Sequence, residues 1–550
     1  MSAIYLIRHG RVELPGEEKI CVGAADVPLS REGRAQMERL KDFVRRAGIK
    51  RIYVSDLARS RESGEILSGG EIPVIVREEL RENTMGEWEM LPFREIRERF
   101  PEEYRRRGEN MADSAPPGGE SFRQCQRRAM LAYRRILAET DGSAAIVGHV
   151  GFFRSLISAL EGRRLERLMD ISMDFGQVYE WSLGSRLGAV IVAAGRASRM
   201  GKTKPLLPVP GGNMLTREIE LLARAGVRHT VVVTGHDAER IRAECSGPGV
   251  EFVFNPEYAS TGMIDSMGMG LAALPDSMEG AFVLPADAPT FSLFTLRRER
   301  DTFDDGNADV IRPWTGELPG HPLLIRSRFF PEIRAYGGEN GLRGLLSLHS
   351  NRIREVELPE PGLAMDADTP EDYRRLLEYL EKDVPDRKRC REILAWRGVP
   401  EALRRHLEAV AARGEELAGN LQSAGWEIDL PLVTAAALLH DLAKGLPGHD
   451  RLGAEWLREM GMPRVADAME RHTDLPERKT VSLEELVVFL ADKLVMGDVP
   501  CDLEERYRQR LEQYGSDPSV AEAIRRRWER AEKWQEYYNR LLKKGAETGR

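Results

Sequence analysis

The hydrophobic pattern of this chain of 550 residues changes once, and that change limits the folds it can adopt. Up to about residue 372, short apolar runs end in polar or Gly-containing loops and are followed by amphipathic helical segments. This alternation is typical of a largely parallel sheet covered by helices. Beyond about residue 385 we find helical periodicity and no convincing strand. The sequence therefore predicts an α/β part followed by an all-α part.

The α/β pattern starts twice. The first strand is predicted at Ile4–Ile7, with a helix from about Ser30 to Arg46, and the alternating run at 177–185 is typical of a closing edge strand. A buried strand at 188–195 then opens a second unit with almost no linker. Further strands are predicted at Ile52–Val54, Ala144–Val147, Thr230–Val233, Phe252–Asn255 and Ala281–Leu284. We expect a multidomain chain in which two α/β three-layer domains with mostly parallel sheets precede one all-α domain. The predicted domains are residues 1–185, 186–383 and 384–550.

Charge and cysteine usage narrow the function classes. The 81 basic and 89 acidic residues give a net charge of −8, whereas a dedicated nucleic-acid-binding protein usually carries a basic stripe. The charged helix expected at about 518–543 interleaves both signs, which is typical of a solvated face. The five cysteines lie far apart without a CxxC pair, a pattern that suits a reducing compartment. We find no run of about 18 apolar residues and no signal-peptide pattern, so we expect a cytoplasmic protein that binds neither membrane nor nucleic acid.

The first candidate site follows the first strand. Arg8 and His9 lie at its carboxyl end, where α/β sheets place ligands. A histidine there can act as a nucleophile toward phosphorus when arginines neutralise the phosphate oxygens. The RHG triplet alone is equally typical of a hydrogen-bonded loop histidine. Arg59 and His149, each after a later strand, and the carboxylate of Glu82 favour the phosphate site.

These residues, with DVPLSREG at 26–33 and GGESFRQCQRR at 118–128, resemble the histidine phosphatase (phosphoglycerate mutase-like) superfamily over residues 1–185. The compact length is similar to the small-molecule phosphatase branch, such as the α-ribazole phosphatases. The resemblance implies that His9 is the phosphorylated nucleophile and Glu82 the general acid for the leaving oxygen. By the same resemblance, the phosphoryl group would be held by Arg8, Arg59 and His149.

The second candidate site is the loop AAGRASRMGKTKPLLP after the strand at 188–195. It is neither GxGxxG nor GxxxxGK[ST], so we predict neither a dinucleotide fingerprint nor a P-loop. Small residues let backbone N–H groups approach phosphates, while Arg199 and Lys204 supply countercharge. The loop is therefore a candidate for binding the phosphates of a nucleotide.

This loop resembles the MobA-like nucleotidyltransferases over about residues 186–382. Segments that match in order are NP at 255–256, GM at 262–263, LPADAP at 284–289, GHP at 320–322 and MDADTPED at 365–372. The NP, GM and GHP elements are most similar to molybdenum cofactor cytidylyltransferases. The resemblance implies that a substrate phosphate attacks the α-phosphorus of an NTP and releases pyrophosphate.

The same resemblance assigns the ligands of the second site. Asp287 would hold Mg²⁺ together with Asp368 or Asp366, since Mg²⁺ prefers hard oxygen ligands. The alternative role for Asp366 and Asp368 is to cap the helix after Thr369, and we expect one of the two to do so. His229, His236 and His349 receive no catalytic role. The nucleotide-binding residues would be Ala194, Gly195, Arg199, Lys204, Asn255 and Ser266.

The third candidate site is a histidine–aspartate pair late in the apolar helical run TAAALLHDLAKG. Adjacent short ligands such as His440 and Asp441 can converge on one metal or a metal pair. Lys444 lies within one helical turn of both, near any bound phosphate. Further candidate ligands lie elsewhere in the helical part, at His406, His449, His472 and Asp492.

The order H…HD…H…H…D resembles the HD-domain phosphohydrolases over about residues 384–550. The resemblance implies a divalent metal held by His406, His440, Asp441 and Asp492, with His449 and His472 completing a second metal site. The metal, Mn, Fe or Mg, would activate water against a phosphoester or phosphoanhydride. Capping of the next helix is the alternative role for His449.

Together the three sites predict a multifunctional cytoplasmic enzyme that handles NTPs and phosphorylated small molecules. The leading hypothesis is Mg²⁺-dependent nucleotidyl transfer to a pterin-type cofactor, flanked by a phosphohistidine phosphatase and a metal-dependent phosphohydrolase. A second hypothesis is corrinoid nucleotide-loop assembly, with a guanylyltransferase and an α-ribazole-type phosphatase. A third is a nucleotide sensor with one or more inactive domains. The third hypothesis rests on the segment RVELP at 11–15, because the histidine phosphatase superfamily often has a Thr and then an Asn at this place.

Overall fold

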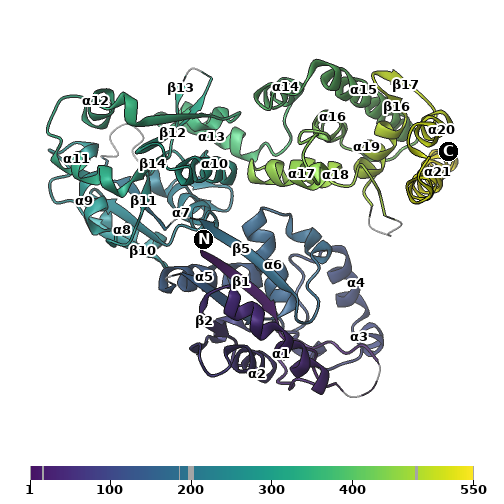
Figure 1. Ribbon diagram of the computed structural model, residues 1–550, viewed down its shortest axis with the longest axis horizontal. Coiled ribbons are helices and arrows are strands. Elements are labelled where there is room, and N and C mark those ends of the chain that lie inside the picture. Colours follow the sequence, from purple (N-terminus) through teal and green to yellow (C-terminus); the bar gives the residue numbers. More distant parts are fainter. Residues whose placement is uncertain are drawn as a thin grey trace. The chain divides into compact units, whose positions relative to one another are not determined.

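The computed structural model describes residues 2–548 except 15, 17, 141, 185, 196–202, 317 and 477–480. The chain forms two compact units (Figure 1). The first consists of Met1–Val356 and Gly362–Leu377, and the second of Glu357–Pro361 and Glu378–Arg550. Both α/β parts lie in the first unit, so the domain join predicted near residue 186 falls inside it.

The first sheet has the strand order β3-β2-β4-β1-β5. Its strands are β1 (Ser2–Arg8), β2 (Ile49–Val54), β3 (Val74–Val76), β4 (Ser143–Gly148) and β5 (Val178–Gly184). The first four run parallel, and β5 closes the edge antiparallel to β1, as its alternating pattern predicts. The sheet therefore presents the carboxyl ends of β1, β2 and β4 side by side.

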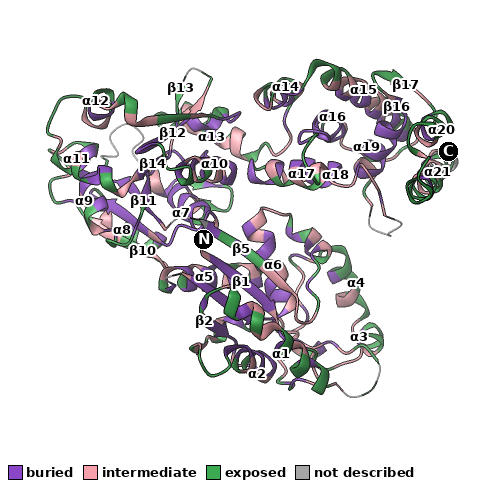
Figure 2. Ribbon diagram, in the orientation of Figure 1, coloured by how far each residue is buried: buried purple, intermediate pink, exposed green. Residues whose placement is uncertain are grey.

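Helices cover both faces of this sheet, because side chains alternate along each strand. Ile4 and Leu6 of β1 pack with one helix pair, and Tyr5 and Ile7 pack with the other. The strands are the most continuously buried elements, whereas the helices carry exposed outer faces (Figure 2). The first helix pair is α5 (Phe122–Glu139) with α6 (Val150–Glu161), and the second is α1 (Arg31–Arg46) with α2 (Ala58–Ser68). Two further helices are α3 (Phe93–Arg99) and α4 (Pro101–Glu109).

The second sheet has the strand order β10-β9-β6-β11-β14-β12-β13, with β15 paired to β12. The strands β10, β9, β6 and β11 are parallel, and β14 is antiparallel to both β11 and β12. The strands are β6 (Leu187–Ala193), β9 (His229–Thr234), β10 (Val250–Phe254), β11 (Gly280–Pro285), β12 (Val310–Thr315), β13 (Leu318–Pro319), β14 (Leu323–Arg326) and β15 (Ile353–Glu357). The predicted strand at Phe252–Asn255 ends one residue too late, since β10 ends at Phe254 and Asn255 lies outside it.

Helix α9 (Met263–Ala273) lies close against the sheet because of a glycine. A Cβ atom at Gly270 would approach Cγ1 of Val190 in β6 to 2.3 Å, so the helix needs a residue without a side chain there. This close packing holds Ser266, one turn earlier, at the edge of the second candidate site. The remaining elements of this part are α7 (Met214–Arg224), α8 (Ala238–Cys245), α10 (Leu293–Asp304), α11 (Phe330–Ala335), α12 (Gly341–Leu348), α13 (Pro370–Glu381), β7 (Pro208–Val209) and β8 (Gly212–Asn213).

The second unit is helical, as predicted, apart from one small hairpin. Its strands β16 (Val495–Met496) and β17 (Val499–Pro500) pair antiparallel, so the prediction of no strand beyond residue 385 is wrong. Each strand has two residues, which is too short for a hydrophobic pattern to reveal. The helices are α14 (Arg387–Trp396), α15 (Glu401–Ser423), α16 (Leu430–Leu439), α17 (His449–Glu459), α18 (Pro463–Met469), α19 (Leu483–Lys493), α20 (Leu503–Tyr514) and α21 (Pro518–Thr548). Among the described residues, none of the helices is both long and apolar enough to cross a membrane.

Candidate functional sites

The first site lies where β1 and β4 end. His9 follows β1 and is 5% exposed, and His149 follows β4 and is fully buried. Their ring centroids are 5.2 Å apart. The parallel pairing of β1 with β4 brings the two histidines together, although 140 residues separate them.

The hydrogen bond of His9 determines which of its ring nitrogens is free. Nδ1 lies 2.8 Å from the carbonyl oxygen of Gly10. Since a carbonyl only accepts, Nδ1 carries the proton and Nε2 keeps a lone pair. Burial, followed by the charges of Arg59 and Arg8, lowers the pKa of His9 to about 3. The ring is therefore neutral near pH 7, and Nε2 can act as a nucleophile.

His149 has both ring nitrogens engaged. Nε of Arg59 donates to its Nδ1 at 3.3 Å, so Nε2 carries the proton and donates to Oγ of Ser55 at 2.8 Å. Burial, and then the charge of Arg59, keeps the pKa of His149 well below its usual value. The other guanidinium donors of Arg59 bind the carbonyl oxygens of Ala25 and Gly23. The buried charge of Arg59 thus faces the histidine pair from a fixed position.

Arg8 is held on the opposite side of the site by an aromatic ring. Its guanidinium carbon lies 3.9 Å from the ring centroid of Phe175, and Nη1 donates to the carbonyl oxygen of Met173 at 2.6 Å. Burial lowers the pKa of Arg8 to about 10, while the charge of Glu82 opposes that shift. The guanidinium remains charged near pH 7 in a partly desolvated position, where it attracts an anion strongly.

Glu82 lies at the amino end of α6, 5% exposed. Its carboxylate accepts hydrogen bonds from the backbone N–H groups of Gly151 at 3.0 Å and Phe152 at 2.9 Å. A Cβ atom at position 151 would come within 2.6 Å of Oε1 of Glu82, so the close contact requires glycine. A cavity of about 430 Å³ opens beside this carboxylate and is lined by Arg81 and Arg128 among others.

The second site surrounds a cavity of about 200 Å³ at the end of β6. Five of the predicted residues line it: Ala194, Gly195, Lys204, Ser266 and Asp287. Asn255 lies behind them, where its Nδ2 donates to Oγ of Ser266 at 3.0 Å. Arg199 lies outside the described residues. His236 also lines the cavity, although the sequence suggested no role for it.

A lysine joins two of the predicted carboxylates. Nζ of Lys204 lies 3.1 Å from Oδ2 of Asp287 and 2.7 Å from Oδ1 of Asp368. Burial raises the pKa of Asp366 to about 6, and the charges of Asp287 and Asp368 add to that shift. Three carboxylates therefore crowd around one ammonium group. This set of hard oxygen donors fits a divalent cation such as Mg²⁺.

Two buried groups beside Asp287 were not assigned roles by the sequence analysis. Glu218 of α7 is fully buried, and no described side chain donates a hydrogen bond to its carboxylate. Burial, followed by the charge of Asp287, raises its pKa well above the usual value. Nδ1 of His321 is likewise buried without a partner. Glu218 lies on an amphipathic helix, where a glutamate is ordinarily a surface residue, so no local pattern predicts its burial.

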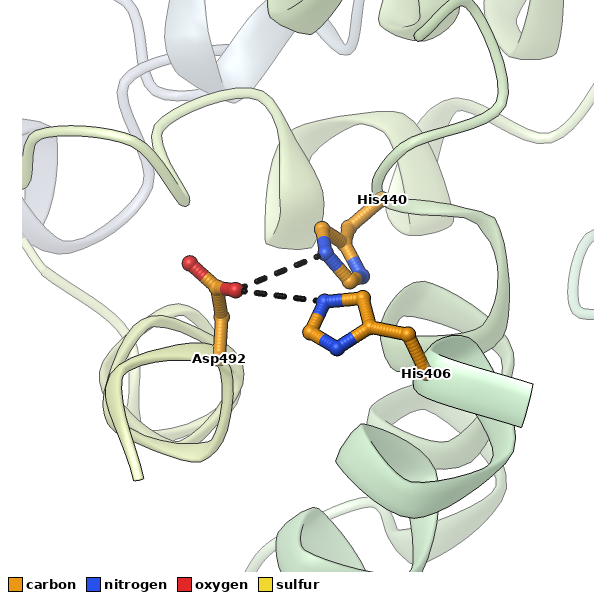
Figure 3. A group of neighbouring side chains, drawn as sticks. All are labelled: His406, His440 and Asp492. Carbon is orange, nitrogen blue, oxygen red and sulfur yellow. Dashed lines mark ion pairs between the residues drawn. The ribbon is translucent and has the colours of Figure 1, made fainter. Parts of the chain in front are cut away.

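The third site collects the predicted ligands from five helical segments. Among the described residues, two sets of ligand atoms lie within 4.8 Å of one another: His406, His440 and Asp492, and His440, Asp441 and His472. In the first set, Oδ1 of Asp492 lies 3.6 Å from Nε2 of His406 and 3.8 Å from Nε2 of His440 (Figure 3). His440 belongs to both sets, so the two sets are adjacent.

Oδ1 of Asp441 is the centre of the second set. It lies 3.4 Å from Nε2 of His472 and 3.2 Å from Nε2 of His449. The amino end of α17 is capped by Gly448 without a side-chain hydrogen bond, and His449 is its first helical residue. The alternative in which His449 only caps that helix is therefore not supported.

Backbone carbonyls orient three of these rings. Nδ1 of His406 donates to the carbonyl oxygen of Gly497 at 2.6 Å, and Nδ1 of His440 donates to that of Ala437 at 2.8 Å. His472 makes the same contact with Met469. Each ring thus turns an unprotonated Nε2 toward the carboxylates, which is the usual arrangement of metal-binding histidines.

The atoms that face one another at the third site lack hydrogen bonds. Nε2 of His440, Nε2 of His449 and Oδ1 of Asp441 are buried without a partner. Lone pairs that converge in this way repel unless a cation lies between them. The residues therefore fit a divalent metal ion, and the imidazole-rich set favours a transition metal.

Lys444 and Lys493 complete the charge balance of the third site. Nζ of Lys444 lies 2.8 Å from Oδ2 of Asp441, and Nζ of the buried Lys493 lies 2.7 Å from Oδ2 of Asp492. The sequence spacing predicts Lys444 on the same helical face as His440 and Asp441. In the structure Lys444 lies in a turn after the end of α16, and this turn brings it to Asp441. Its side chain is 52% exposed and is free to reach a bound anion.

Family models match all three parts of the chain. The histidine phosphatase superfamily (branch 1) matches residues 4–190, the MobA-like NTP transferase domain residues 189–355, and the HD domain residues 403–497. Phosphoglycerate mutase-like protein 4 of Arabidopsis thaliana is 30% identical over 186 residues, which cover 32% of this chain and 80% of that protein. The chain belongs to the histidine phosphatase superfamily and continues with a MobA-like NTP transferase domain and an HD domain.

Two further relatives match parts of the chain. The molybdenum cofactor cytidylyltransferase of Escherichia coli (strain K12) is 27% identical over 190 residues, 34% of this chain and 94% of that protein. The adenosylcobalamin/alpha-ribazole phosphatase of Salmonella typhimurium (strain LT2) is 30% identical over 159 residues, 28% of this chain and 78% of that protein. All three families are enzyme families, so the chain is an enzyme with phosphatase, nucleotidyltransferase and phosphohydrolase domains.

Several neighbours of the phosphatase site were missed by the sequence analysis. Ser55 holds His149, Phe175 supports Arg8, and Arg154 acts electrostatically on Arg8. Ser55 follows β2 directly, so its place at the carboxyl edge of the sheet was a usable signal. Phe175 lies in a loop far along the chain, and no local pattern connects it to Arg8.

Proposed function

We propose that the MobA-like domain transfers a nucleotidyl group from an NTP to a phosphorylated small molecule and uses Mg²⁺ to do so. The observation that carries this proposal is Lys204, whose ammonium group contacts Asp287 and Asp368 at the edge of the cavity that Ala194 and Gly195 line. Phosphate-binding groups and metal-binding groups thus lie in one small cavity, as a nucleotidyl transfer requires.

Each group in this cavity has a distinct role. The backbone at Ala194 and Gly195 offers N–H groups to the triphosphate, and Lys204 adds positive charge. Because Asn255 donates to the Ser266 hydroxyl, the Ser266 proton is available to a ligand. Mg²⁺ held by Asp287 and Asp368 would neutralise charge on the phosphate oxygens as pyrophosphate leaves.

The acceptor in this proposal is a pterin-type cofactor phosphate, and the nucleotide is CTP. Support comes from the match to the Escherichia coli molybdenum cofactor cytidylyltransferase, of which the chain covers 94%. The second candidate is nucleotide-loop assembly on a corrinoid with GTP. It is favoured by the match to the Salmonella typhimurium adenosylcobalamin/alpha-ribazole phosphatase. Both reactions suit the cytoplasm expected from the cysteine pattern.

The phosphatase domain hydrolyses phosphomonoesters through His9 in this proposal. Nε2 attacks phosphorus and forms an N–P bond, while the P–O bond to the leaving group breaks and Glu82 gives that oxygen a proton. Arg8 and Arg59 stabilise the transferred phosphoryl group. Water then attacks the phosphohistidine, with Glu82 taking a proton from it, and phosphate leaves with Nε2 unprotonated again.

The HD domain carries out the third proposed reaction, hydrolysis of a phosphoester or phosphoanhydride. His406, His440, Asp441 and Asp492 would hold one divalent metal, and His449 and His472 would help hold a second. A bound metal supplies an activated water molecule and neutralises phosphate charge. Lys444, exposed beside Asp441, orients the substrate phosphate.

Pyrophosphate release tests the transferase proposal. Purified chain with Mg²⁺ is assayed against each NTP and a set of phosphorylated acceptors, with Asp287→Asn as the test variant and Asp276→Asn, exposed and remote from the cavity, as the control. We expect the control to match the parent and Asp287→Asn to lose at least about 100-fold in rate. No pyrophosphate from any NTP with any acceptor would contradict the proposal. Preference for CTP or GTP decides between the pterin and corrinoid acceptors.

A further inference from the structure

The cavity over the HD metal site extends beyond the HD domain itself. It measures about 650 Å³, a size suited to a small organic ligand. One side consists of metal-site residues, including His406, Asp441 and Asp492. The other side consists of α20 and α21, which follow residue 497, where the HD family match ends. The chain therefore adds a wall that the family match does not include.

Two arginines of this wall have no hydrogen-bonded or ion-paired partner in the part of the chain that the structure describes. Arg510 of α20 and Arg527 of α21 both line the cavity, and neither has a hydrogen bond or ion pair among the described residues. Other arginines of the same helices are paired: Arg508 with Glu504, and Arg526 with Glu522. Arg510 and Arg527 differ from these two in lining the cavity without a partner in the described chain.

The charge of Arg510 is costly to hold in this position. Burial lowers the pKa of Arg510 and the charge of Arg506 lowers it further, while the charge of Asp492 opposes the shift. Arg506 is itself buried and donates to the carbonyl oxygen of Asp492 at 2.6 Å. Like charges in a partly desolvated cavity repel, and a bound anion relieves that repulsion.

Aromatic stacking fixes the positions of the two arginines. The rings of Tyr507 and Trp528 lie 5.9 Å apart at an interplanar angle of 7°. Tyr507 precedes Arg510 by nearly one helical turn, and Trp528 is the neighbour of Arg527 in sequence. The stack thus ties α20 to α21 and keeps both guanidinium groups at the same cavity.

The rest of the wall suits the organic part of a ligand. Gln509, Gln513 and Tyr514 offer polar groups, and Val520 and Ile524 offer apolar surface. The cavity thus joins a metal-binding end, a cationic wall and a mixed surface in one space. Such a combination matches a metabolite whose phosphate groups are joined by an organic body.

We propose that this cavity binds a small molecule with two anionic phosphate groups, one placed at the HD metal site and the other held by Arg510 and Arg527. The proposal rests on the phosphohydrolase function proposed for the HD domain and names its substrate class. The reactive phosphate lies at the metal ligands, and the second phosphate sets specificity. Arg510 and Arg527 are positioning residues of this reaction.

Hydrogen–deuterium exchange with a non-hydrolysable probe tests the proposal on the full chain. The probe is hexamethylene diphosphonate, and hexylphosphonate is its analogue with a single anionic group. Both are added with Mn²⁺, because the first anionic group needs a cation between it and the carboxylates of the metal site, and neither probe can be hydrolysed. Exchange is followed by mass spectrometry in peptides from α20 and α21, which separates this cavity from the phosphatase and transferase sites.

We expect the diphosphonate to slow exchange in α20 and α21 of the parent protein, with an apparent affinity at least about tenfold above that of hexylphosphonate. Arg510→Gln combined with Arg527→Gln removes this protection. Arg508→Gln combined with Arg525→Gln takes the same charge from the same helices outside the cavity and keeps it. Equal protection in the two double variants, or by the two probes, overturns the proposal, as does no protection in the parent.

Thermal unfolding separates a binding role from a structural one. Because Arg510 and Arg527 are unpaired, Arg510→Gln with Arg527→Gln leaves Tm unchanged or raises it in the absence of ligand. A large fall in Tm would assign the two arginines to the fold instead. If the proposed HD function is wrong, the parent protein shows no metal-dependent hydrolysis. This result is independent of whether the diphosphonate protects α20 and α21.

Discussion

The phosphatase site and the HD site are both built from buried histidines, yet their surroundings are electrically opposite. His9 and His149 lie beside Arg8 and Arg59, whose charges help lower the pKa values of the two rings. His440 lies instead beside Asp441 and other carboxylates, whose charges oppose the lowering of its pKa to about 4 by burial. The same side chain therefore meets cations in one domain and anions in the other.

The charges around each pair of histidines determine which ligand the site attracts. A neutral imidazole among guanidinium groups is a nucleophile in a site that draws phosphate oxygens. A neutral imidazole among carboxylates is a ligand in a site that draws a metal cation. In both sites a backbone carbonyl fixes Nδ1–H and directs Nε2 inward. The countercharges, rather than the histidines, assign the chemistry.

Replacing the nucleophile should change activity more than any other single substitution. His9→Ala should lower hydrolysis of phosphomonoesters in EDTA by at least about 10³-fold, since the neighbouring ring of His149 has its Nε2 engaged with Ser55. Intact-protein mass spectrometry after rapid acid quench should show a phosphorylated species in the parent and none in the variant. Metal content and HD activity should stay at the parent level. A phosphorylated His9→Ala protein would contradict the assignment of His9.

The next effect concerns the metal ligands. His472→Ala should weaken metal binding by at least about 100-fold, because its Nε2 faces Asp441 and its Nδ1 is already held by Met469. Metal content after desalting, measured by plasma mass spectrometry, checks this. His349→Ala is the matched control, since His349 lies in the transferase domain against Phe329. Equal metal content in the two variants would remove His472 from the ligand set.

A smaller effect tests the contact between Glu82 and α6. Gly151→Ala should lower kcat for alkyl phosphates by about tenfold, because the new Cβ would meet Oε1 of Glu82 at 2.6 Å and Oδ1 of Asn83 at 2.7 Å. Hydrolysis of p-nitrophenyl phosphate should fall less, since its leaving group needs no proton. Gly108→Ala, which meets open space, is the control. The same loss for both substrates would mean that Glu82 is not the acid.

The smallest effect is a pH-dependent change in stability at the transferase site. The pKa of Asp366 is raised to about 6, so the folded state binds more protons than the unfolded state between about pH 4 and pH 6. Stability from this group is therefore lost as the pH rises through that window. Asp366→Asn should raise the free energy of unfolding at pH 7.5 by at most about 1 kcal/mol, because the side chain is partly exposed.

Denaturant unfolding in EDTA at pH 4 and pH 7.5 measures this change. The gain from Asp366→Asn should be present at pH 7.5 and should vanish at pH 4. Asp276→Asn, in an exposed turn, should show no such dependence. A gain of the same size at both pH values would mean that the carboxylates around Lys204 do not crowd one another.

The sequence predicts much of the fold because strand ends and motifs coincide. The strand at Ile4–Ile7 and the edge strand at 177–185 appear as β1 and β5, since a continuous apolar run is typical of a strand buried on both faces and alternation is typical of an edge strand. The hairpin of β16 and β17 could not be predicted, because its two short strands are set by tertiary packing. The same hairpin supplies Gly497, whose carbonyl oxygen orients His406.

Site residues, like strands, can be predicted where a local sequence pattern marks them and not where tertiary packing places them. Motif residues such as His440 and Asp441 are adjacent in sequence, so local patterns reveal them. Arg527 belongs to the charged helix at 518–543, whose interleaved signs predict a solvated face, and the packing of α20 on α21 places Arg510 and Arg527 at the same cavity. Glu218 was missed for the same reason, since burial of one helix face is decided by its neighbours.

A crossed chelation assay tests the central contrast most directly. Phosphoester hydrolysis by the parent, His9→Ala and His440→Ala is measured with Mn²⁺ and with EDTA. We expect two separable activities: one that survives EDTA and disappears in His9→Ala, and one that requires metal and disappears in His440→Ala. Loss of both activities in either single variant, or loss of the His9-dependent activity in EDTA, would contradict the assignment of the two sites.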